Sequence, residues 1–421
     1  MKQTRSRDLL VVAFHYPPIV GSSGVYRTLS FTRHLADEGY HVEVVTAALT
    51  AYESWSPEQY ELIPSNVKVR RAFALEVTKH LSFKGKYFSF MSLPDNWQSW
   101  ILGGFFTGLW SAFKRKPKLI FSTYPIASAH IIGYLLHKVL GVPWVADLRD
   151  PMAQKNYPAD PRKKKIFLWI ERKIVEKCQF AIVTTPGAKA FYLEKFPDSN
   201  PDFWKVLPNG FDDKTFNSVI ESVSQDASIS QNENDKLVLL HSGIIYPKER
   251  NPNALFEAVS ELKIAGELSA ATLEIRLRAT GHDEIYAKRI AELDIADIIK
   301  LEPTISYKEA IAEMMSADGF LLMQSQGCNH QIPAKSYEYI KLKKPILGLM
   351  PEEGDTGQLI SNLNIAELAP LDDKDKTKEA LLRFIQRLTD NEFVMPADSV
   401  VNSYSRSAQA VELTKLIDEL E

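Results

Sequence analysis

Residues 9–46 read LLVVAFHYPPIVGSSGVYRTLSFTRHLADEGYHVEVVT and contain three secondary-structure signals in a row. Leu9–Phe14 is a continuous apolar run, which predicts a buried strand. A loop at His15–Gly24 follows, and Val25–Glu38 carries apolar residues at helical spacing, which predicts a helix. His41–Thr46 predicts the next strand. Because a strand, a helix and a strand within about 40 residues form a βαβ unit, this stretch predicts a parallel sheet.

The same alternation recurs along the rest of the chain. Further strands are expected at Leu119–Ser122, Trp144–Asp147, Phe180–Thr184, Trp204–Leu207, Lys236–His241, Leu273–Ala279, Ile298–Leu301, Gly319–Met323 and Ile346–Leu349, with helices between them. The polar stretch Ser218–Asp235 interrupts this pattern and is typical of a linker or surface loop. We therefore predict an α/β protein of two doubly wound halves, with ligands at the carboxyl ends of the strands and in a cleft between the sheets.

The composition limits the function classes. The chain has 421 residues, which suits two domains, and 50 Lys and Arg against 53 Asp and Glu give a net charge of -3. This balance provides no global field to recruit nucleic acid. Cys178 and Cys328 are too far apart to suggest a disulfide framework or a zinc site, which fits a reducing cytoplasm. The first residues do not resemble a signal peptide, and no segment reaches the ~20 apolar residues of a membrane span.

The segment Trp97–Phe113, WQSWILGGFFTGLWSAF, is apolar and aromatic, and it precedes the basic residues Lys114, Arg115 and Lys116. An aromatic helix that ends in a basic cluster suits a membrane interface. A helix that is apolar all round suits a protein core instead. We favour the core interpretation, and a half-buried helix stays open in case the substrate lies in a bilayer.

Asn329–Leu347, NHQIPAKSYEYIKLKKPIL, predicts a loop, a helix and a buried strand. Pro333 suits the first helical turn, and Lys335 and Glu338 share one face because they are three residues apart. The free N–H groups and positive dipole of a helix N-terminus suit a phosphate. A carboxylate one turn further can accept hydrogen bonds from sugar hydroxyls. The combination suits a nucleotide sugar, and an ordinary charged surface helix is the alternative.

The loop after the first strand, HYPPIVGSSG, is a second candidate ligand site. Gly21 and Gly24 allow tight turns and close approach of a ligand. Ser22 and Ser23 add hydroxyls, which could also cap the next helix. The glycine spacing is not GxGxxG, so a nicotinamide dinucleotide site is not favoured. A plain strand-to-helix loop is the alternative.

Charged residues follow a strand in the motif WVADLRDP. Asp147, Arg149 and Asp150 could contact acceptor hydroxyls near a reaction centre. Alternatively the arginine pairs with the two carboxylates and only fixes the loop. Two carboxylates without a third ligand do not indicate a metal.

The motif HSGIIYPKERNP opens the second half of the chain. Ser242 and Gly243 are small and allow the backbone to approach a ligand closely. Lys248 and Arg250 could neutralise a diphosphate, which arginine binds with its fork of donors. A solvated charged loop is the alternative.

Together these motifs resemble the retaining GT-B glycosyltransferases of the family-4 type over nearly the whole chain. The matching pieces occur in the family's order: HYPPIVGSSG, VADLRDP, WIERKIVEKC, TTPG, PNGFD, HSGIIYPKERNP, IPAKSYEYIKLKKPIL and SYSRSAQAVELTKLI. The resemblance implies two Rossmann-like domains that face each other across a cleft. The acceptor-side domain would span residues 1–215, a polar linker or surface loop 216–235, the donor-binding domain 236–400, and a helix crossing back to the first domain 401–421.

The resemblance also implies roles for single residues. The catalytic residues would be Lys248, Arg250, Arg149 and Asp150, and the donor-binding residues Gly21, Ser22, Ser23, Gly24, Ser242, Gly243, His330, Lys335, Ser336 and Glu338. Glu338 matches the second glutamate of the family's E-x7-E element and would bind the donor ribose. His330 stands where the first glutamate is usual, which leaves the donor sugar open. Ile244 replaces the arginine that usually follows Gly243.

The implied activity is transfer of a sugar from a nucleotide-diphosphate sugar, such as a UDP-hexose, to an acceptor hydroxyl with retention of configuration. The acceptor would be a saccharide or lipid-linked molecule in bacterial cell-surface polysaccharide or glycolipid synthesis. No cofactor, metal or nucleic acid is expected, since Lys and Arg would offset the diphosphate charge. The expected location is cytoplasmic, with peripheral contact at the inner face of the membrane as a variant. The alternatives are an inverting GT-B transferase, a nucleotide-sugar epimerase and a catalytically idle GT-B binding scaffold.

Overall fold

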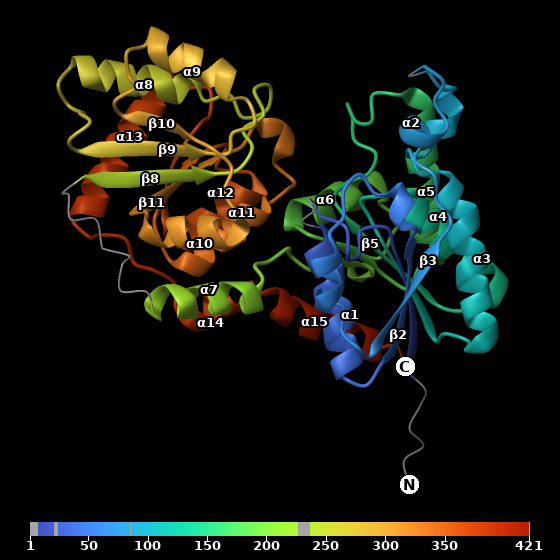
Figure 1. The fold of residues 1–421 in the computed structure, drawn as a ribbon. Coiled ribbons are helices and arrows are strands. Elements are labelled where there is room, and N and C mark those ends of the chain that lie inside the picture. The colour runs from blue at the N-terminus through green and yellow to red at the C-terminus, as the bar shows by residue number, and fades with distance from the viewer. Residues whose placement is uncertain (1–6, 21–23, 85, 226–235, 421) are drawn as a thin grey trace. The chain divides into compact units, whose positions relative to one another are not determined.

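The computed structural model describes residues 7–20, 24–84, 86–225 and 236–420. The chain divides into two compact units, shown as ribbons in Figure 1. Unit 1 comprises residues 1–209 together with 406–421, and unit 2 comprises residues 210–405. The predicted boundaries at residues 215, 236 and 401 therefore lie near, but not at, the points where the chain passes between the units.

Unit 1 is built on a seven-stranded parallel sheet with the order β3-β2-β1-β4-β5-β6-β7. Its strands are β1 (Asp8–Ala13), β2 (His41–Ala47), β3 (Val67–Ala72), β4 (Leu119–Thr123), β5 (Trp144–Arg149), β6 (Ala181–Val183) and β7 (Trp204–Val206). All residues of β1 are buried, as expected for a central strand with helices on both faces. The strand, helix and strand predicted within residues 9–46 are confirmed as β1, α1 and β2.

Helices cover both faces of this sheet (Figure 1). They are α1 (Gly24–Asp37), α2 (Val77–His80), α3 (Ser99–Lys114), α4 (Ser128–Leu140), α5 (Pro161–Lys177), α6 (Pro186–Lys195) and α15 (Arg406–Asp418), with short 3-10 turns η1 (Leu49–Ala51), η2 (Pro57–Leu62), η3 (Ser89–Ser92) and η4 (Pro201–Phe203). The last helix, α15, packs on α1 through the buried side chains of Leu413 and Ile417. The end of the chain is thereby part of the core of unit 1.

Unit 2 repeats the plan with a six-stranded parallel sheet in the order β10-β9-β8-β11-β12-β13. Its strands are β8 (Leu237–Ser242), β9 (Leu273–Arg278), β10 (Ile299–Glu302), β11 (Gly319–Met323), β12 (Ile346–Leu349) and β13 (Ala366–Ala369). Its helices are α7 (Asp213–Gln225), α8 (Asn253–Ile264), α9 (Asp283–Glu292), α10 (Tyr307–Ser316), α11 (Ala334–Leu342), α12 (Asp355–Asn362), α13 (Lys374–Thr389) and α14 (Asp398–Ser403), with the 3-10 turn η5 (Gln326–Cys328). Two doubly wound α/β halves are therefore confirmed.

The strand order of each sheet reverses at one point. In unit 2 the chain builds outward from β8 to β10 and then returns to β11 on the other side of β8. In unit 1 the same reversal falls between β1 and β4. Loops that leave the carboxyl ends of the two strands at such a point diverge and leave a crevice, where doubly wound proteins bind ligands. The ends of β8 and β1 are therefore the places to look for sites.

The predicted linker is wrong for residues 216–225. Helix α7 covers them, and Phe216 and Val219 are buried against Phe211 in the core of unit 2. Two apolar side chains three residues apart bury one helix face even where the rest is polar. Residues 226–235, the remainder of the predicted linker, lie outside the described residues.

Helix α3 is buried on one side only, so the favoured core interpretation of this segment is wrong for its outer side. Trp100, Gly104 and Gly108 pack inward, where the two glycines bring the helix against Ile132 and Leu136 of α4. Phe106 and Phe113 are exposed on the opposite side. Within the described parts of the chain, no helix is long and apolar enough to cross a membrane.

Candidate functional site

A histidine and a lysine meet at the carboxyl end of β8. Lys335, in the first turn of α11, places its Nζ 3.2 Å from Nε2 of the fully buried His241. Nδ1 of His241 lies 2.9 Å from the carbonyl oxygen of Leu321 and must donate to it. Nε2 is therefore the unprotonated nitrogen and accepts from Lys335. Burial, followed by the charge of Lys335, holds the pKa of His241 well below its usual value, which keeps the imidazole neutral.

Lys335 itself is strongly perturbed. Burial, followed by the positive charge of Arg250, lowers its pKa to about 7, and Glu338 opposes the shift. Burial disfavours the ammonium form, and a second cation nearby adds to the effect. A group of this kind is stabilised in its charged form when an anion binds beside it. Arg250 and Lys335 together therefore define a position that favours a doubly charged anion.

Gly243 allows the side chain of Lys335 to lie close to the end of β8. Its φ is +115°, a backbone conformation that favours glycine, and a Cβ at this position would lie 3.1 Å from Nζ of Lys335. The preceding residue is also fixed, because the amide of Ser242 donates to the hydroxyl of Tyr339 at 3.1 Å. Tyr339 stacks on Phe320 of β11 with ring centroids 4.0 Å apart. Helix α11 and the end of β8 are thus held together by the core of unit 2.

The N-terminus of α11 has no side-chain cap. The cap position is occupied by Pro333, which the sequence places in the first turn, and it forms no capping hydrogen bond. The amide of Ser336 donates to the carbonyl oxygen of Pro333 at 3.0 Å, and the amides of Ala334 and Lys335 before it suit a phosphate. Ser336 lies in the same turn and is fully buried.

Glu338 lies one turn further along α11 and is held by a neighbouring helix. The hydroxyl of Tyr307 donates to Oε1 of Glu338 at 2.8 Å. Tyr307 opens α10, which begins at a capping box formed by Ser306 and Glu309. One carboxylate oxygen of Glu338 is thereby fixed in position, which suits a contact with a sugar hydroxyl.

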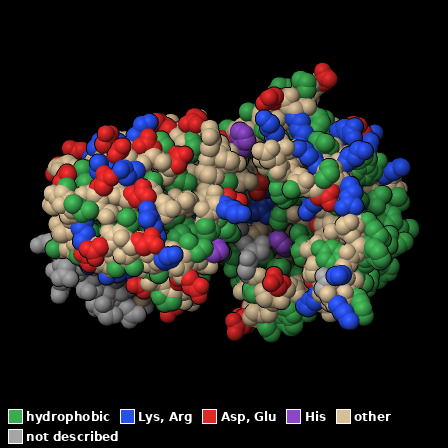
Figure 2. All heavy atoms as spheres, turned by 90° about the horizontal axis from the view of Figure 1, so that it is seen from above, with side chains coloured by type: hydrophobic (Ala, Val, Ile, Leu, Met, Phe, Trp, Pro, Cys, Tyr) green, Lys and Arg blue, Asp and Glu red, His purple; other side chains and the backbone are tan. Residues whose placement is uncertain are grey.

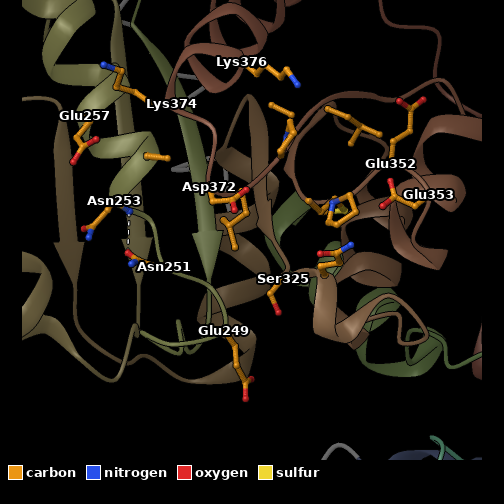
Figure 3. A pocket seen from close by; sticks show the side chains of 18 of the residues that line it. Glu249, Asn251, Asn253, Glu257, Ser325, Glu352, Glu353, Asp372, Lys374 and Lys376 are labelled. Carbon is orange, nitrogen blue, oxygen red and sulfur yellow. Dashed lines mark hydrogen bonds between the residues drawn. The ribbon is translucent and has the colours of Figure 1, made fainter. Parts of the chain in front are cut away.

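Two other predicted site residues, Lys248 and His330, are exposed. Lys248 lines a cavity of about 870 Å³. The segments after β8, β11, β12 and β13 and the starts of α8 and α13 form this cavity, as Figure 3 shows for Asn251, Ser325 and Lys374. Carboxylates and cations alternate around this cavity, among them Glu257, Glu352 and Lys374, so its charge does not single out an anion. His330 is exposed in the loop before α11. Among the predicted residues of unit 2, Lys248 and His330 are therefore the exposed ones, whereas Ser336 is buried.

Arg250 belongs to the Lys335 group. Its guanidinium lies over the ring of Tyr246 at 5.6 Å, and Nη1 is 3.5 Å from the carbonyl oxygen of Ile244. Its Nε is buried without a hydrogen-bond partner among the described residues. A guanidinium with an unused donor near a half-buried lysine suits an anionic ligand.

In unit 1 the predicted charged cluster is rearranged. Asp147 is fully buried and pairs with Arg27 of α1, through Nη2–Oδ1 at 3.0 Å and Nε–Oδ2 at 3.2 Å. The guanidinium of Arg27 also donates to the carbonyl oxygens of Leu207 and Pro208. Thr123 donates to Oδ2 of Asp147 at 2.8 Å. Asp147 is therefore structural, and the arginine that pairs with it is not the adjacent Arg149.

Arg149 and Asp150 remain at the carboxyl end of β5. Arg149 has φ +60°, an unusual conformation for a residue with a side chain, and its Nη1 lies 3.3 Å from the carbonyl oxygen of Tyr124. Burial raises the pKa of Asp150, and Arg149 partly offsets this. His15, at the end of β1, has a pKa lowered to about 4 by burial and then by Arg149. These three side chains form a polar group at the switch point of the first sheet.

The predicted loop HYPPIVGSSG is only partly described. Gly21, Ser22 and Ser23 lie outside the described residues. Gly24 is buried and begins α1. Within the described parts of the chain, no group of three or more His, Cys, Asp and Glu side chains is arranged to hold a metal ion.

Three contacts of the site were missed by the sequence reasoning: His241 with Lys335, Tyr307 with Glu338, and Arg27 with Asp147. The first joins β8 to α11, the second joins α10 to α11, and the third joins residues 120 apart in sequence. Position offers one signal for the first two contacts, since His241 lies near the end of β8 and Tyr307 follows β10, both toward the edge of the sheet where ligands bind. No pattern marks Arg27, which lies on a helix among apolar residues.

The sequence of unit 1 is similar to a known family of proteins. Residues 24–210 match the sequence model of the family described as Glycosyl transferase 4-like domain. No curated protein sequence matches the chain. Residues 24–210 are thus similar to this family, and the two doubly wound parallel sheets are those of the GT-B fold.

Solved structures with this fold align with the chain over its whole length. A glycosyltransferase from Rickettsia africae is similar with a TM-score of 0.68 and 12% identity, covering 99% of this chain and 98% of that one. HepE from Anabaena, solved in complex with UDP, gives a TM-score of 0.66 and 12% identity, over 98% and 100% of the two chains. Sucrose-phosphate synthase from Thermosynechococcus elongatus gives a TM-score of 0.65 and 15% identity, over 98% and 99%. At these identities the likeness establishes the fold alone.

Proposed function

We propose that the protein transfers a hexose from a UDP-sugar to an acceptor hydroxyl with retention of configuration. The observation that carries the proposal is the meeting of Arg250, Lys335 and the uncapped start of α11 at the switch point of unit 2. Departure of a nucleoside diphosphate develops negative charge on the leaving oxygen. Cations and amides already in place stabilise that charge without reorganising, and in many enzymes this stabilisation contributes more to the rate than any other effect.

The donor would lie across the carboxyl end of the second sheet. Its diphosphate would contact Arg250, Lys335 and the first amides of α11, and its ribose hydroxyls would contact Glu338. Gly243 leaves room for the phosphate because it has no side chain. UDP as the nucleotide carrier is supported by the complex of HepE with UDP, a protein of the same fold. Since two cations serve the diphosphate, the reaction needs no divalent metal, and chelation should leave turnover unchanged.

The acceptor would be bound by unit 1. His15, Arg149 and Asp150 place a neutral imidazole, a guanidinium and a carboxyl group at the ends of β1 and β5. Such groups bind and orient a hydroxyl rather than ionise it. Retention and a role in bacterial cell-surface polysaccharide or glycolipid synthesis follow the family-4 resemblance, and a cytoplasmic location fits cytoplasmic nucleotide sugars.

The test of this function begins with donor binding. Thermal unfolding should be followed with UDP-, GDP- and ADP-sugars, and a shift with UDP-sugars alone identifies the carrier. Turnover is then measured with saccharide acceptors, and proton and carbon NMR of the product linkage distinguishes retention from inversion. Release of a free epimerised sugar nucleotide without acceptor would favour an epimerase, a class whose structures share this fold. Binding without turnover would favour an idle scaffold.

Replacing Glu338 with alanine should weaken donor binding more than it slows the chemical step. The loss of hydrogen bonds to a sugar hydroxyl costs about 1.5–3 kcal/mol when the acceptor is charged, which raises KM for the donor roughly 10- to 100-fold. Steady-state kinetics with varied donor measure the effect. Glu267→Ala, a change of the same type at an exposed position after α8, is the control. An unchanged KM in Glu338→Ala would exclude the ribose contact.

The pKa of Lys335 predicts a pH dependence of UDP binding. In the free protein this pKa is about 7, so the lysine is increasingly neutral above that value. A diphosphate favours the ammonium form and raises the pKa, so binding above pH 7 takes up a proton. The Kd for UDP should therefore rise by up to about tenfold for each pH unit between pH 7 and pH 9. Calorimetric titrations across this range measure it.

Lys335→Arg is the matched variant, since arginine stays charged throughout this range. Its Kd for UDP should be nearly flat between about pH 7 and pH 9. A flat profile in the unmodified protein, or the same slope in both proteins, would contradict the assignment of the titration to Lys335.

A further inference from the structure

Unit 1 has an apolar surface on the outer side of α3. Leu102, Phe106, Trp110 and Phe113 are exposed to 64%, 63%, 48% and 80%. Spacings of four, four and three residues place them along one side of the helix. Exposed apolar residues that occur singly are ordinary, but a row of four large ones over three turns is not. We call these four residues the α3 stripe.

The stripe continues onto the neighbouring segment. A Cβ on Gly103 would lie 2.0 Å from the backbone carbonyl oxygen of Phe73, so α3 rests directly on the backbone that follows β3. The side chain of Phe73 is exposed to 60%. Further along this segment, the exposed rings of Phe88 and Phe90 stack with centroids 5.8 Å apart. The apolar surface is therefore wider than one helix.

Exposed basic residues outnumber acidic ones along this part of the chain, although Arg115 pairs with Asp8 and Arg70 pairs with Glu43. Residues 77–118 contain seven Lys and Arg, namely Lys79, Lys84, Lys86, Lys114, Arg115, Lys116 and Lys118, and one acidic residue, Asp95. Asp95 is buried and accepts hydrogen bonds from Ser128 at the start of α4, so it does not offset the exposed charge. Figure 2 shows hydrophobic side chains gathered along the side of unit 1 where Figure 1 draws α3, with Lys and Arg side chains nearby.

Two cations lie directly against the stripe. Nζ of Lys114 is 3.8 Å from the ring centre of Trp110, and the guanidinium carbon of Arg70 is 4.2 Å from the same ring. An indole with cations on it and phenylalanines beside it has an apolar body and a charged rim. This arrangement suits the boundary between acyl chains and anionic headgroups, where basic residues add to the apolar contact.

We propose that the α3 stripe and Phe73 dock unit 1 on the surface of a bilayer that contains anionic lipids. The charge argument selects this occupant over a second copy of the chain, because two such faces would bring the exposed Lys114 and Lys116 of each copy together. The contact is peripheral, since the stripe is one side of a helix whose other side is packed on α4. This inference does not rest on the proposed transferase reaction.

Vesicle co-sedimentation of the full chain tests the proposal. Vesicles of phosphatidylcholine alone are compared with vesicles of phosphatidylcholine and phosphatidylglycerol in equal parts. We expect binding to the anionic vesicles, weakened by salt, and little binding to the neutral ones. The double variant Phe106→Ser, Phe113→Ser should lower the membrane partition coefficient at least about tenfold, because two large apolar side chains no longer enter the membrane. The two changes alter no charge, so charge repulsion does not contribute to the loss.

Control variants separate apolar contact, charge and folding. Ile264→Ser changes an isoleucine of α8 that is 83% exposed, and it should bind vesicles as the unmodified chain does. Lys114→Ser and Lys116→Ser should each lower binding to anionic vesicles roughly fivefold. Thermal unfolding of all variants should stay near that of the unmodified chain, since the altered side chains are exposed.

Three results would overturn the proposal. The first is no binding to either vesicle at low salt. The second is equal binding by the Phe106→Ser, Phe113→Ser variant and the unmodified chain. The third is self-association of the unmodified chain in sedimentation velocity, together with a monomeric double variant. That result would assign the α3 stripe to contact with a second copy of the chain. If the proposed function is correct, the same variant should still transfer sugar to a soluble acceptor. The membrane hypothesis and the transferase hypothesis can therefore fail separately.

Discussion

Replacing Lys335 with methionine is expected to lower kcat/KM for sugar transfer by about 10²- to 10³-fold, the usual cost of one preorganised donor to developing charge. The methionine keeps most of the volume of the lysine stem, so the change removes a charge and a donor rather than packing. It also removes the hydrogen bond to Nε2 of His241. Steady-state kinetics with a UDP-sugar and an acceptor measure the result.

The control for this prediction is on the same helix. Lys341→Met makes the same chemical change at the other end of α11, where the lysine lies over the ring of Phe211 at 5.1 Å. Its kcat/KM should stay within a few-fold of normal. Arg250→Ala should also slow transfer, and by removing the second cation it should raise the pKa of Lys335. Near-normal turnover in both Lys335→Met and Arg250→Ala would contradict the proposed diphosphate site.

Replacing Arg27 with leucine is expected to destabilise unit 1 by about 3–5 kcal/mol, the usual cost of removing one partner of a buried ion pair. The change leaves the buried carboxylate of Asp147 with the hydrogen bond from Thr123 and without those from Arg27. It also removes the hydrogen bonds that Arg27 donates to the carbonyl oxygens of Leu207 and Pro208. Urea unfolding measures the free energy. All seven tryptophans lie between residues 55 and 204, so their fluorescence follows unit 1 and not unit 2.

Two further variants show how much of the lost stability is due to the buried ion pair. Arg33→Leu, also on α1, removes one hydrogen bond to a carbonyl oxygen and should cost about 1 kcal/mol. Arg27→Leu combined with Asp147→Leu removes both buried charges and should be less destabilising than the sum of the single changes. An Arg27→Leu protein that unfolds like the unmodified chain would show that the pair does not hold α1 to the sheet.

The elements of the first sheet illustrate what was predictable. The apolar run that forms β1 and the helical spacing that forms α1 are local patterns, and both predict their elements within a residue or so of the observed bounds. The short strand β3, VKVRRA, was not predicted, because its polar residues look like a loop until the neighbouring strand β2 is present to pair with it. Helix α7 was missed for a similar reason, since its few apolar residues matter only against the core of unit 2.

The sequence predicted which residues belong to the candidate site, but not which contacts those residues make. Lys335 and Glu338 share a helix face by spacing alone, so their grouping needed no structure. Lys248 and Arg250 are two residues apart, and the sequence predicts that they act together. The structure turns one toward a mixed-charge cavity and the other toward Lys335, because the loop between β8 and α8 bends between them. The spacing of two residues in a loop does not determine the directions in which their side chains point.

The order of strands, helices and glycine-bearing loops was enough to establish two doubly wound α/β halves and to resemble a GT-B glycosyltransferase, because periodicity and order are properties of neighbouring residues. Tertiary structure alone determined that Asp147 pairs with Arg27, that His241 accepts from Lys335, and that one side of α3 is left uncovered. Each of these depends on which distant segments exclude water from a side chain. Burial of that kind arises only when the sheets are assembled, and it sets both the pKa of Lys335 and the exposure of the α3 stripe.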